Sequence, residues 1–181
     1  MTRFGYVMVT YFSVMGFAAA SFVPTSPRLV WNASASVPIG LYELEPAGDL
    51  KIGDLVAFIP EKPLADFMIE RRYIGRGVPL MKHVAALAGQ TVCRTGNAVT
   101  VDAVPFGDAL DRDKRGRELP IWQGCRRIAN SDIFVMNPDA PDSLDGRYFG
   151  PIAARTVIGK ATPLYTDEEG DGHFVWRAAT R

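Results

Sequence analysis

An uncharged apolar segment near the N-terminus most constrains what this chain can fold into. Residues 4–23 contain no Asp, Glu, Lys or Arg, and they follow Met1 and Arg3. A helix of about 20 residues spans about 30 Å, the thickness of a bilayer's hydrocarbon core. Three interpretations are open: an uncleaved membrane anchor, which we favour, a cleaved signal peptide ending in the small residues 18–20, and a buried helix of a soluble protein. The lone Arg3 favours a cytoplasmic N-terminus and an exported body.

The remaining chain has the length of one domain and carries no excess charge. The protein has 181 residues, of which 48% are hydrophobic, and its 20 Lys and Arg balance 20 Asp and Glu. A chain of this length buries one core. Nucleic-acid binding depends on a basic excess, so the composition argues against that class of function. We therefore expect an anchor or signal segment over residues 1–27 and a single body over residues 28–181.

Short β-prone runs dominate this body. They cover residues 41–44, 54–59, 91–95, 98–101, 121–128, 133–136, 157–162 and 174–177. Gly96-Asn97 is a two-residue hairpin signal between two of these runs. Residues 64–73 instead have apolar positions near helical spacing, and they follow Pro63. The sequence predicts a mainly β protein: an antiparallel β body with one N-terminal transmembrane helix and one short inserted helix.

The two cysteines, Cys93 and Cys125, do not form a metal-binding pattern. Neither belongs to a C-x-x-C pair, so a zinc site is not expected. In an oxidising compartment they would form one disulfide that closes a long loop. Two separate buried thiols are the alternative, and the sequence does not decide between them.

Ser34 and Ser36 lie in an irregular loop that contains Pro38 and Gly40. A serine nucleophile needs an exposed place on a fixed backbone, with amide donors nearby for an oxyanion. An ordinary polar turn is the alternative interpretation of this loop.

Lys82 lies in an apolar stretch, residues 79–89, which makes it a candidate general base. An ordinary lysine, with a pKa near 10.4, is neutral only about once in 2,500 at pH 7. Burial against apolar side chains can lower that pKa by about 3 to 5 units. The alternative is a lysine at a strand edge whose amine reaches water. The two histidines, His83 and His173, give no evident support for a Ser-His-Asp triad.

Ser143, Asp145 and Arg147 alternate along the chain. In an extended segment they would share one face. The Asp-Arg pair would then brace a loop, and the serine hydroxyl would hold a lysine amine. A polar turn after the strand ending at Met136 is the alternative.

Taken in order, these segments resemble the type I signal peptidase family, and more closely its conjugal-transfer, TraF-type branch. The matching segments are residues 34–42 (SASVPIGLY), 53–58 (GDLVAF), 82–89 (KHVAALAG) and 143–150 (SLDGRYFG), together with the apolar segment. The chain departs from the family pattern at residues 136–139, where Met-Asn-Pro-Asp replaces the usual Gly-Asp-Asn-Arg, and at Gly146, where a serine is usual.

The resemblance implies a role for each candidate residue. Ser36 is expected to be the nucleophile and Lys82 its general base. Ser34 is expected to help form the oxyanion hole and Ser143 to orient the lysine, with Asp145 and Arg147 as a supporting ion pair. No cofactor and no metal is implied.

The resemblance also implies a membrane-associated serine peptidase with a signal-peptidase-like body that processes a conjugative pilin precursor during plasmid transfer. Whether the product is a linear chain or one cyclised head to tail is left open. We expect the protein in the inner membrane, with residues 28–181 as a periplasmic catalytic domain that is free in the periplasm if residues 1–27 are cleaved. Its expected partners are the pilin precursor, the membrane and the transfer apparatus, without nucleic acid. The alternatives are a general type I signal peptidase of secretion and a non-catalytic scaffold of a transfer apparatus.

Overall fold

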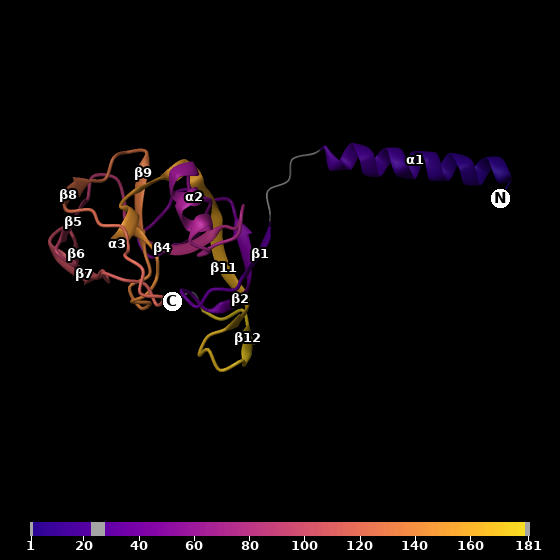
Figure 1. Ribbon diagram of the computed structural model, residues 1–181. Helices are drawn as coiled ribbons and strands as arrows, with labels where there is room; N and C mark the ends of the chain where they lie inside the picture. The colour runs from indigo at the N-terminus through magenta and orange to yellow at the C-terminus, as the bar shows by residue number, and fades with distance from the viewer. Residues whose placement is uncertain (1, 23–27, 180–181) are drawn as a thin grey trace.

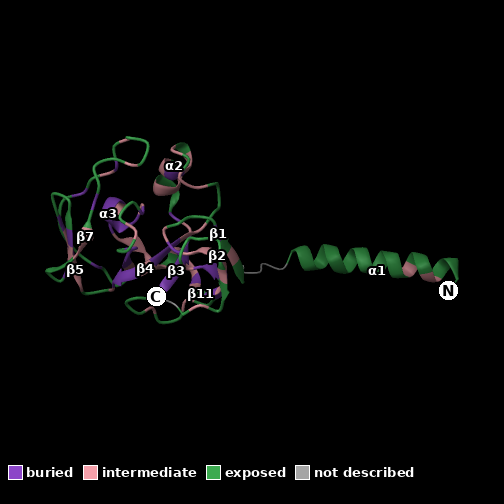
Figure 2. Cartoon of the chain, turned by 90° about the horizontal axis from the view of Figure 1, so that it is seen from below, coloured by how far each residue is buried: buried purple, intermediate pink, exposed green. Residues whose placement is uncertain are grey.

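The computed structural model describes residues 2–22 and 28–179. The N-terminal segment forms α1 (Arg3–Ser21), which has no buried residue and stands apart from the body (Figures 1 and 2). Within the described residues it is the one helix long and apolar enough to cross a membrane. The predicted end of the apolar segment at residue 23 and the predicted boundary at residue 27 lie outside the described residues.

A large antiparallel sheet forms the main part of the body. Its strands run in the order β1-β2-β11-β3-β4-β9-β10, and β12 pairs with β11. They are β1 (Leu29–Asn32), β2 (Ile39–Glu45), β3 (Leu55–Phe58), β4 (Leu80–Ala86), β9 (Asp132–Met136), β10 (Ile152–Ala153), β11 (Val157–Asp167) and β12 (Phe174–Trp176). Every residue of β3 is buried, as are four of the five residues of β9. Because β4 lies between these two strands, a side chain on it can be kept from water.

A smaller antiparallel sheet lies at the end of the body that is far from β1 and α1 (Figure 1). Its order is β7-β6-β5-β8, with β5 (Thr91–Thr95), β6 (Ala98–Val101), β7 (Val104–Asp108) and β8 (Gly124–Arg127). Strands β5 and β6 form the hairpin predicted from Gly96-Asn97, with the predicted bounds. Cys93 and Cys125 lie opposite each other on β5 and β8 and form a disulfide. Of the two alternatives, the structure has the disulfide and not two separate thiols.

The mainly β architecture is confirmed, and several element bounds differ from the prediction. The inserted helix is α2 (Lys62–Glu70), which begins two residues before the predicted start and ends three before the predicted end. Arg72, two residues after α2, has a positive φ of 57°, which ends the helical path. The strand predicted over residues 121–128 shortens to β8, which begins at Gly124 with a positive φ of 88°. Trp122, before this strand, is buried and donates its indole N–H to the Gly146 carbonyl. Strands β1, β4, β7 and β10 were not predicted.

Two short helical segments were also not predicted: α3 (Gly146–Phe149) and a 3-10 helix over Ala154–Thr156. Residues 143–147 are therefore not the extended segment in which Ser143, Asp145 and Arg147 would share one face. The Asp145 carboxylate accepts a hydrogen bond from the Arg147 backbone N–H and so caps the N-terminus of α3. Such a local bond from an aspartate competes with the extended conformation. Gly146 is needed there because an added Cβ would lie 2.5 Å from the Phe134 ring.

Candidate active site

The loop between β1 and β2 carries Ser36 and is held from inside by one buried residue, Asn32. The Asn32 Nδ2 lies 2.7 Å from the Ser34 carbonyl oxygen, 3.1 Å from that of Val37 and 3.0 Å from that of Pro38. Its Oδ1 accepts the Ser34 backbone N–H at 3.1 Å. A single carboxamide thus ties both arms of the turn, and Ser36 lies on a fixed backbone as a nucleophile requires.

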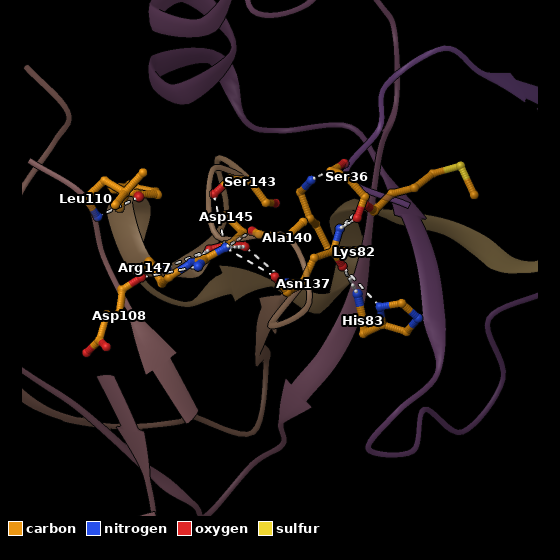
Figure 3. A network of polar contacts seen from close by, with 12 residues as sticks. Ser36, Lys82, His83, Asp108, Leu110, Asn137, Ala140, Ser143, Asp145 and Arg147 are labelled. Carbon is orange, nitrogen blue, oxygen red and sulfur yellow. Dashed lines mark hydrogen bonds and ion pairs between the residues drawn. The ribbon is translucent and has the colours of Figure 1, made fainter. Parts of the chain in front are cut away.

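The structure brings Ser36 and Lys82 together from 46 positions apart. The Lys82 Nζ donates a hydrogen bond to the Ser36 Oγ at 2.9 Å (Figure 3). Lys82 lies on β4 and is 3% exposed, while Ser36 is half-buried. The alternative of a strand-edge lysine with its amine in water is therefore wrong. A serine hydroxyl within hydrogen-bond distance of a buried amine is the geometry that proton abstraction from the serine needs.

Burial changes the acid-base behaviour of this lysine. Removal of its ammonium from water lowers the pKa of Lys82 from 10.5 to about 8. The charge of Asp145 opposes this change, and the charge of Arg147 adds to it. At pH 7 a lysine with such a pKa is neutral roughly one time in ten, against about once in 3,000 for an exposed one. The neutral amine, which can accept a proton, is thus present in useful amounts near neutral pH.

Ser34 lies beside Ser36, the candidate nucleophile. Its Oγ is 3.2 Å from the Ser36 Oγ and donates to the Asn32 Oδ1 at 3.0 Å. A hydroxyl rotates freely about its C–O bond, so the same proton can turn toward an oxyanion formed next to Ser36. The position is compatible with the predicted oxyanion role.

Asp145 and Arg147 form the expected ion pair, and it is deeply buried. Arg147 Nη2 lies 2.8 Å from Asp145 Oδ2, and their side chains are 1% and 0% exposed. Arg147 also donates to the carbonyl oxygens of Asn137 and Ala140. The pair therefore braces the loop between β9 and α3 (Figure 3).

The structure does not form the predicted contact between Ser143 and the lysine. The Ser143 Oγ is buried and has no hydrogen-bond partner among the described residues. Ser143 is linked to the site instead through its backbone carbonyl, which accepts a hydrogen bond from Arg147 Nη2 at 3.3 Å. The orienting role of its hydroxyl stays a prediction.

Sequence reasoning missed Asn137, which lies between these groups. Its side chain donates to the Ser36 carbonyl oxygen at 2.8 Å and to that of Met81 at 3.2 Å. Its Oδ1 accepts the His83 backbone N–H at 3.0 Å. The only signal in the sequence was its place before Pro138, at the end of a predicted strand and in the segment that departs from the family pattern.

A cavity of about 330 Å³ opens beside Ser36. Its apolar lining includes Val37, Ile39 and Leu55, and its acidic lining includes Asp139 and Glu168. The cavity therefore places a mixed apolar and acidic surface next to the Ser36 hydroxyl.

Comparisons with known proteins show which family the chain resembles. Residues 1–166 match the family model described as "Signal peptidase, peptidase S26". The chain is 32% identical over 145 residues to a "Plasmid transfer protein TraF" of Escherichia coli, covering 75% of this chain and 81% of that protein. It is 34% identical over 150 residues to a "Probable conjugal transfer protein TraF" of Sinorhizobium fredii, covering 75% of this chain and 76% of that one.

One solved structure to which the chain is similar is that of a signal peptidase I from Enterococcus faecalis V583. It is 18% identical in sequence, and the match covers 63% of this chain and 97% of that chain with a TM-score of 0.37.

Proposed function

The chain belongs to the peptidase S26 family of signal peptidases, and we propose that it is a membrane-bound Ser/Lys peptidase that matures a pilin precursor during conjugal plasmid transfer. The observation that carries the proposal is the 2.9 Å contact between the Ser36 hydroxyl and the buried Lys82 amine. The names of its TraF relatives support the setting in plasmid transfer.

The proposed reaction is acyl transfer. Neutral Lys82 removes the Ser36 proton as the Ser36 Oγ attacks a peptide carbonyl. The Ser36 backbone N–H and the Ser34 hydroxyl stabilise the developing oxyanion. The Lys82 ammonium then gives its proton to the departing amine, which leaves an acyl-enzyme on Ser36.

Two nucleophiles can resolve this acyl-enzyme. Water gives a linear product, whereas the N-terminal amine of the same precursor gives a cyclic one, and both reactions return the serine. The proposal includes both outcomes, and the mass of the product distinguishes the linear pilin from the cyclic one.

The N-terminal helix and the body's surface support a location at a membrane, which we propose to be the inner membrane with the body in the periplasm. Helix α1 is apolar and has no buried residue. Strand β1 follows it closely in the chain, and its Trp31 stacks on Phe174 of β12, which in turn stacks on Tyr165. Trp31, Tyr165 and Trp176 are all exposed. Amphipathic rings of this kind favour the headgroup region of a bilayer, so this edge of the sheet would face the membrane.

A precursor-processing assay tests the proposed function. Full-length protein in detergent is mixed with the purified pilin precursor, and the products are weighed by mass spectrometry. We expect cleavage of the precursor. A product with the mass of the linear cleaved chain identifies hydrolysis, and one that is lighter by one water identifies cyclisation. Cleavage of a general secretory precursor but not of the pilin would instead identify a general signal peptidase, and no cleavage of either would favour a scaffold.

The pKa of Lys82 predicts the pH dependence of this activity. Only the neutral amine accepts the serine proton, so kcat/KM should rise with pH and reach half its maximum near pH 8. The measurement is the cleavage rate of the precursor at low concentration from pH 6 to pH 10. A rate that still rises steeply at pH 10, as the ordinary lysine value of 10.5 would give, would contradict a buried base.

A further inference from the structure

The Asn137 side chain takes the place of a peptide group in the large sheet. Strand β9 ends at Met136, which pairs with His83 of β4, while β4 itself extends back to Leu80. Beyond the end of β9, the Asn137 carboxamide continues the ladder. It accepts from the His83 N–H and donates to the Met81 carbonyl, the two backbone groups on either side of Lys82.

The orientation of this carboxamide follows from its partners. The His83 backbone N–H is a donor, so the atom facing it must be the oxygen. The carbonyl oxygens of Ser36 and Met81 are acceptors, so the atom facing them must be the NH2 group. Both amide hydrogens are used, one on the strand that carries the lysine and one on the loop that carries the serine.

Asn137 is also fixed through its own backbone. Its N–H donates to Asp145 Oδ2 at 3.0 Å, and its carbonyl oxygen accepts from Arg147 Nη2 at 3.2 Å. The residue is 2% exposed. The buried ion pair therefore holds Asn137, and Asn137 in turn holds both halves of the proposed dyad (Figure 3).

We propose that Asn137 is a positioning residue, which sets the distance between Ser36 and Lys82 by bonding the serine loop directly to the backbone that flanks the lysine. The inference rests on the proposed function for its catalytic meaning. Among the described residues, no other side chain is seen to bond both the Ser36 carbonyl and the strand of Lys82. Asn32 organises the serine loop internally and makes no bond to β4.

The chemistry of the position requires an amide. Aspartate has the same shape and keeps the acceptor, but it cannot donate to the two carbonyl oxygens. Its carboxylate would also stabilise the ammonium of the neighbouring lysine and raise the pKa of Lys82. Alanine removes the link and leaves backbone groups of β4 and the loop unpaired.

The test compares Asn137→Ala and Asn137→Asp with wild type in the precursor assay, using full-length protein. Asn130→Ala, at the exposed turn between β8 and β9, is the matched control. We expect kcat to fall by about 100-fold in both Asn137 variants, because a displacement of about 1 Å at the reacting atoms has that effect, with KM changed by less than about threefold. In Asn137→Asp we also expect the half-maximal pH to move above 8, which a loss of folded protein alone would not produce.

A crystal structure of Asn137→Ala gives a readout that does not depend on activity. We expect the distance from Lys82 Nζ to Ser36 Oγ to lengthen beyond hydrogen-bond range. The inference is overturned if that distance stays near the wild-type value, or if both variants keep wild-type kcat. It is also overturned if Asn137→Asp loses activity with an unshifted pH profile. An inactive wild type with the expected lengthening would count against the proposed function and leave the positioning role standing.

Discussion

Replacing Ser36 with Ala, or Lys82 with Ala, should each lower kcat for precursor cleavage by about 10⁴-fold or more. The two side chains act as one unit in the proposed reaction, since the hydroxyl is inert without its base and the base has no other proton to take. The double replacement should therefore cost little more than either single one. Cleavage rates under single-turnover conditions, with product mass as the readout, check this.

A lysine-to-arginine change separates the proton-transfer role from hydrogen bonding. Lys82→Arg keeps a positive donor near Ser36, but a guanidinium does not lose its proton in proteins, so it should be as inactive as the alanine form. Ser131→Ala and Lys51→Ala, both at exposed positions, are the matched controls and should behave as wild type. Activity above about 1% of wild type in Ser36→Ala would mean that another group is the nucleophile.

The parts of the fold that depend on local chemistry were predictable. The β5–β6 hairpin followed from Gly96-Asn97, because a two-residue turn of this composition matches the twist of paired strands. The N-terminal helix followed from the absence of charge over residues 4–23. The loop between β9 and α3 did not follow, because alternation at Ser143, Asp145 and Arg147 suits a strand as well as it suits a helix cap joined to a buried ion pair. The helix cap forms because the Asp145 carboxylate binds the Arg147 N–H and because Phe134 leaves no room for a side chain at Gly146, and both contacts depend on the folded structure.

The candidate site was predictable only in part, and for a physical reason. The apolar neighbours of Lys82 indicated burial and hence a lowered pKa. Nothing local to either residue, however, indicated that Lys82 would meet Ser36, since that contact depends on how β2, β11, β3 and β4 are ordered in the sheet. The resemblance to a family supplied that pairing.

The same limit explains why Asn137 was missed. Its function depends on three partners from distant segments, Ser36, Met81 and His83. It also lies where the chain differs from the family pattern, so the resemblance gave it no role. The role of a residue that joins two distant segments can be recognised only in the folded structure, where both segments are in contact with it.

The buried ion pair should produce the largest single effect on stability. Arg147→Met is expected to lower the free energy of unfolding by about 3 to 5 kcal/mol, because it leaves the Asp145 carboxylate buried without its counter-charge. For a body of this size the melting temperature should fall by roughly 10 °C, which calorimetry of the full-length protein measures. The losses in the free energy of unfolding for Arg147→Met and Asp145→Asn should not be additive. The double variant should lose less than the sum of the two single losses, because neither charge is then left buried without its partner.

The exposed pair Arg112–Glu118 is the matched control for this prediction, because its side chains are 60% and 80% exposed at a distance of 3.2 Å. Water and salt screen such a pair, so Arg112→Met should cost no more than about 1 kcal/mol. A similar small loss for Arg147→Met would mean that the loop between β9 and α3 is held by packing and backbone bonds alone. Asn137 would then have to be fixed by its bonds to β4 and not by the charges behind it. A large loss of stability in Arg147→Met would instead show that the ion pair fixes Asn137, which in turn positions the serine and the lysine.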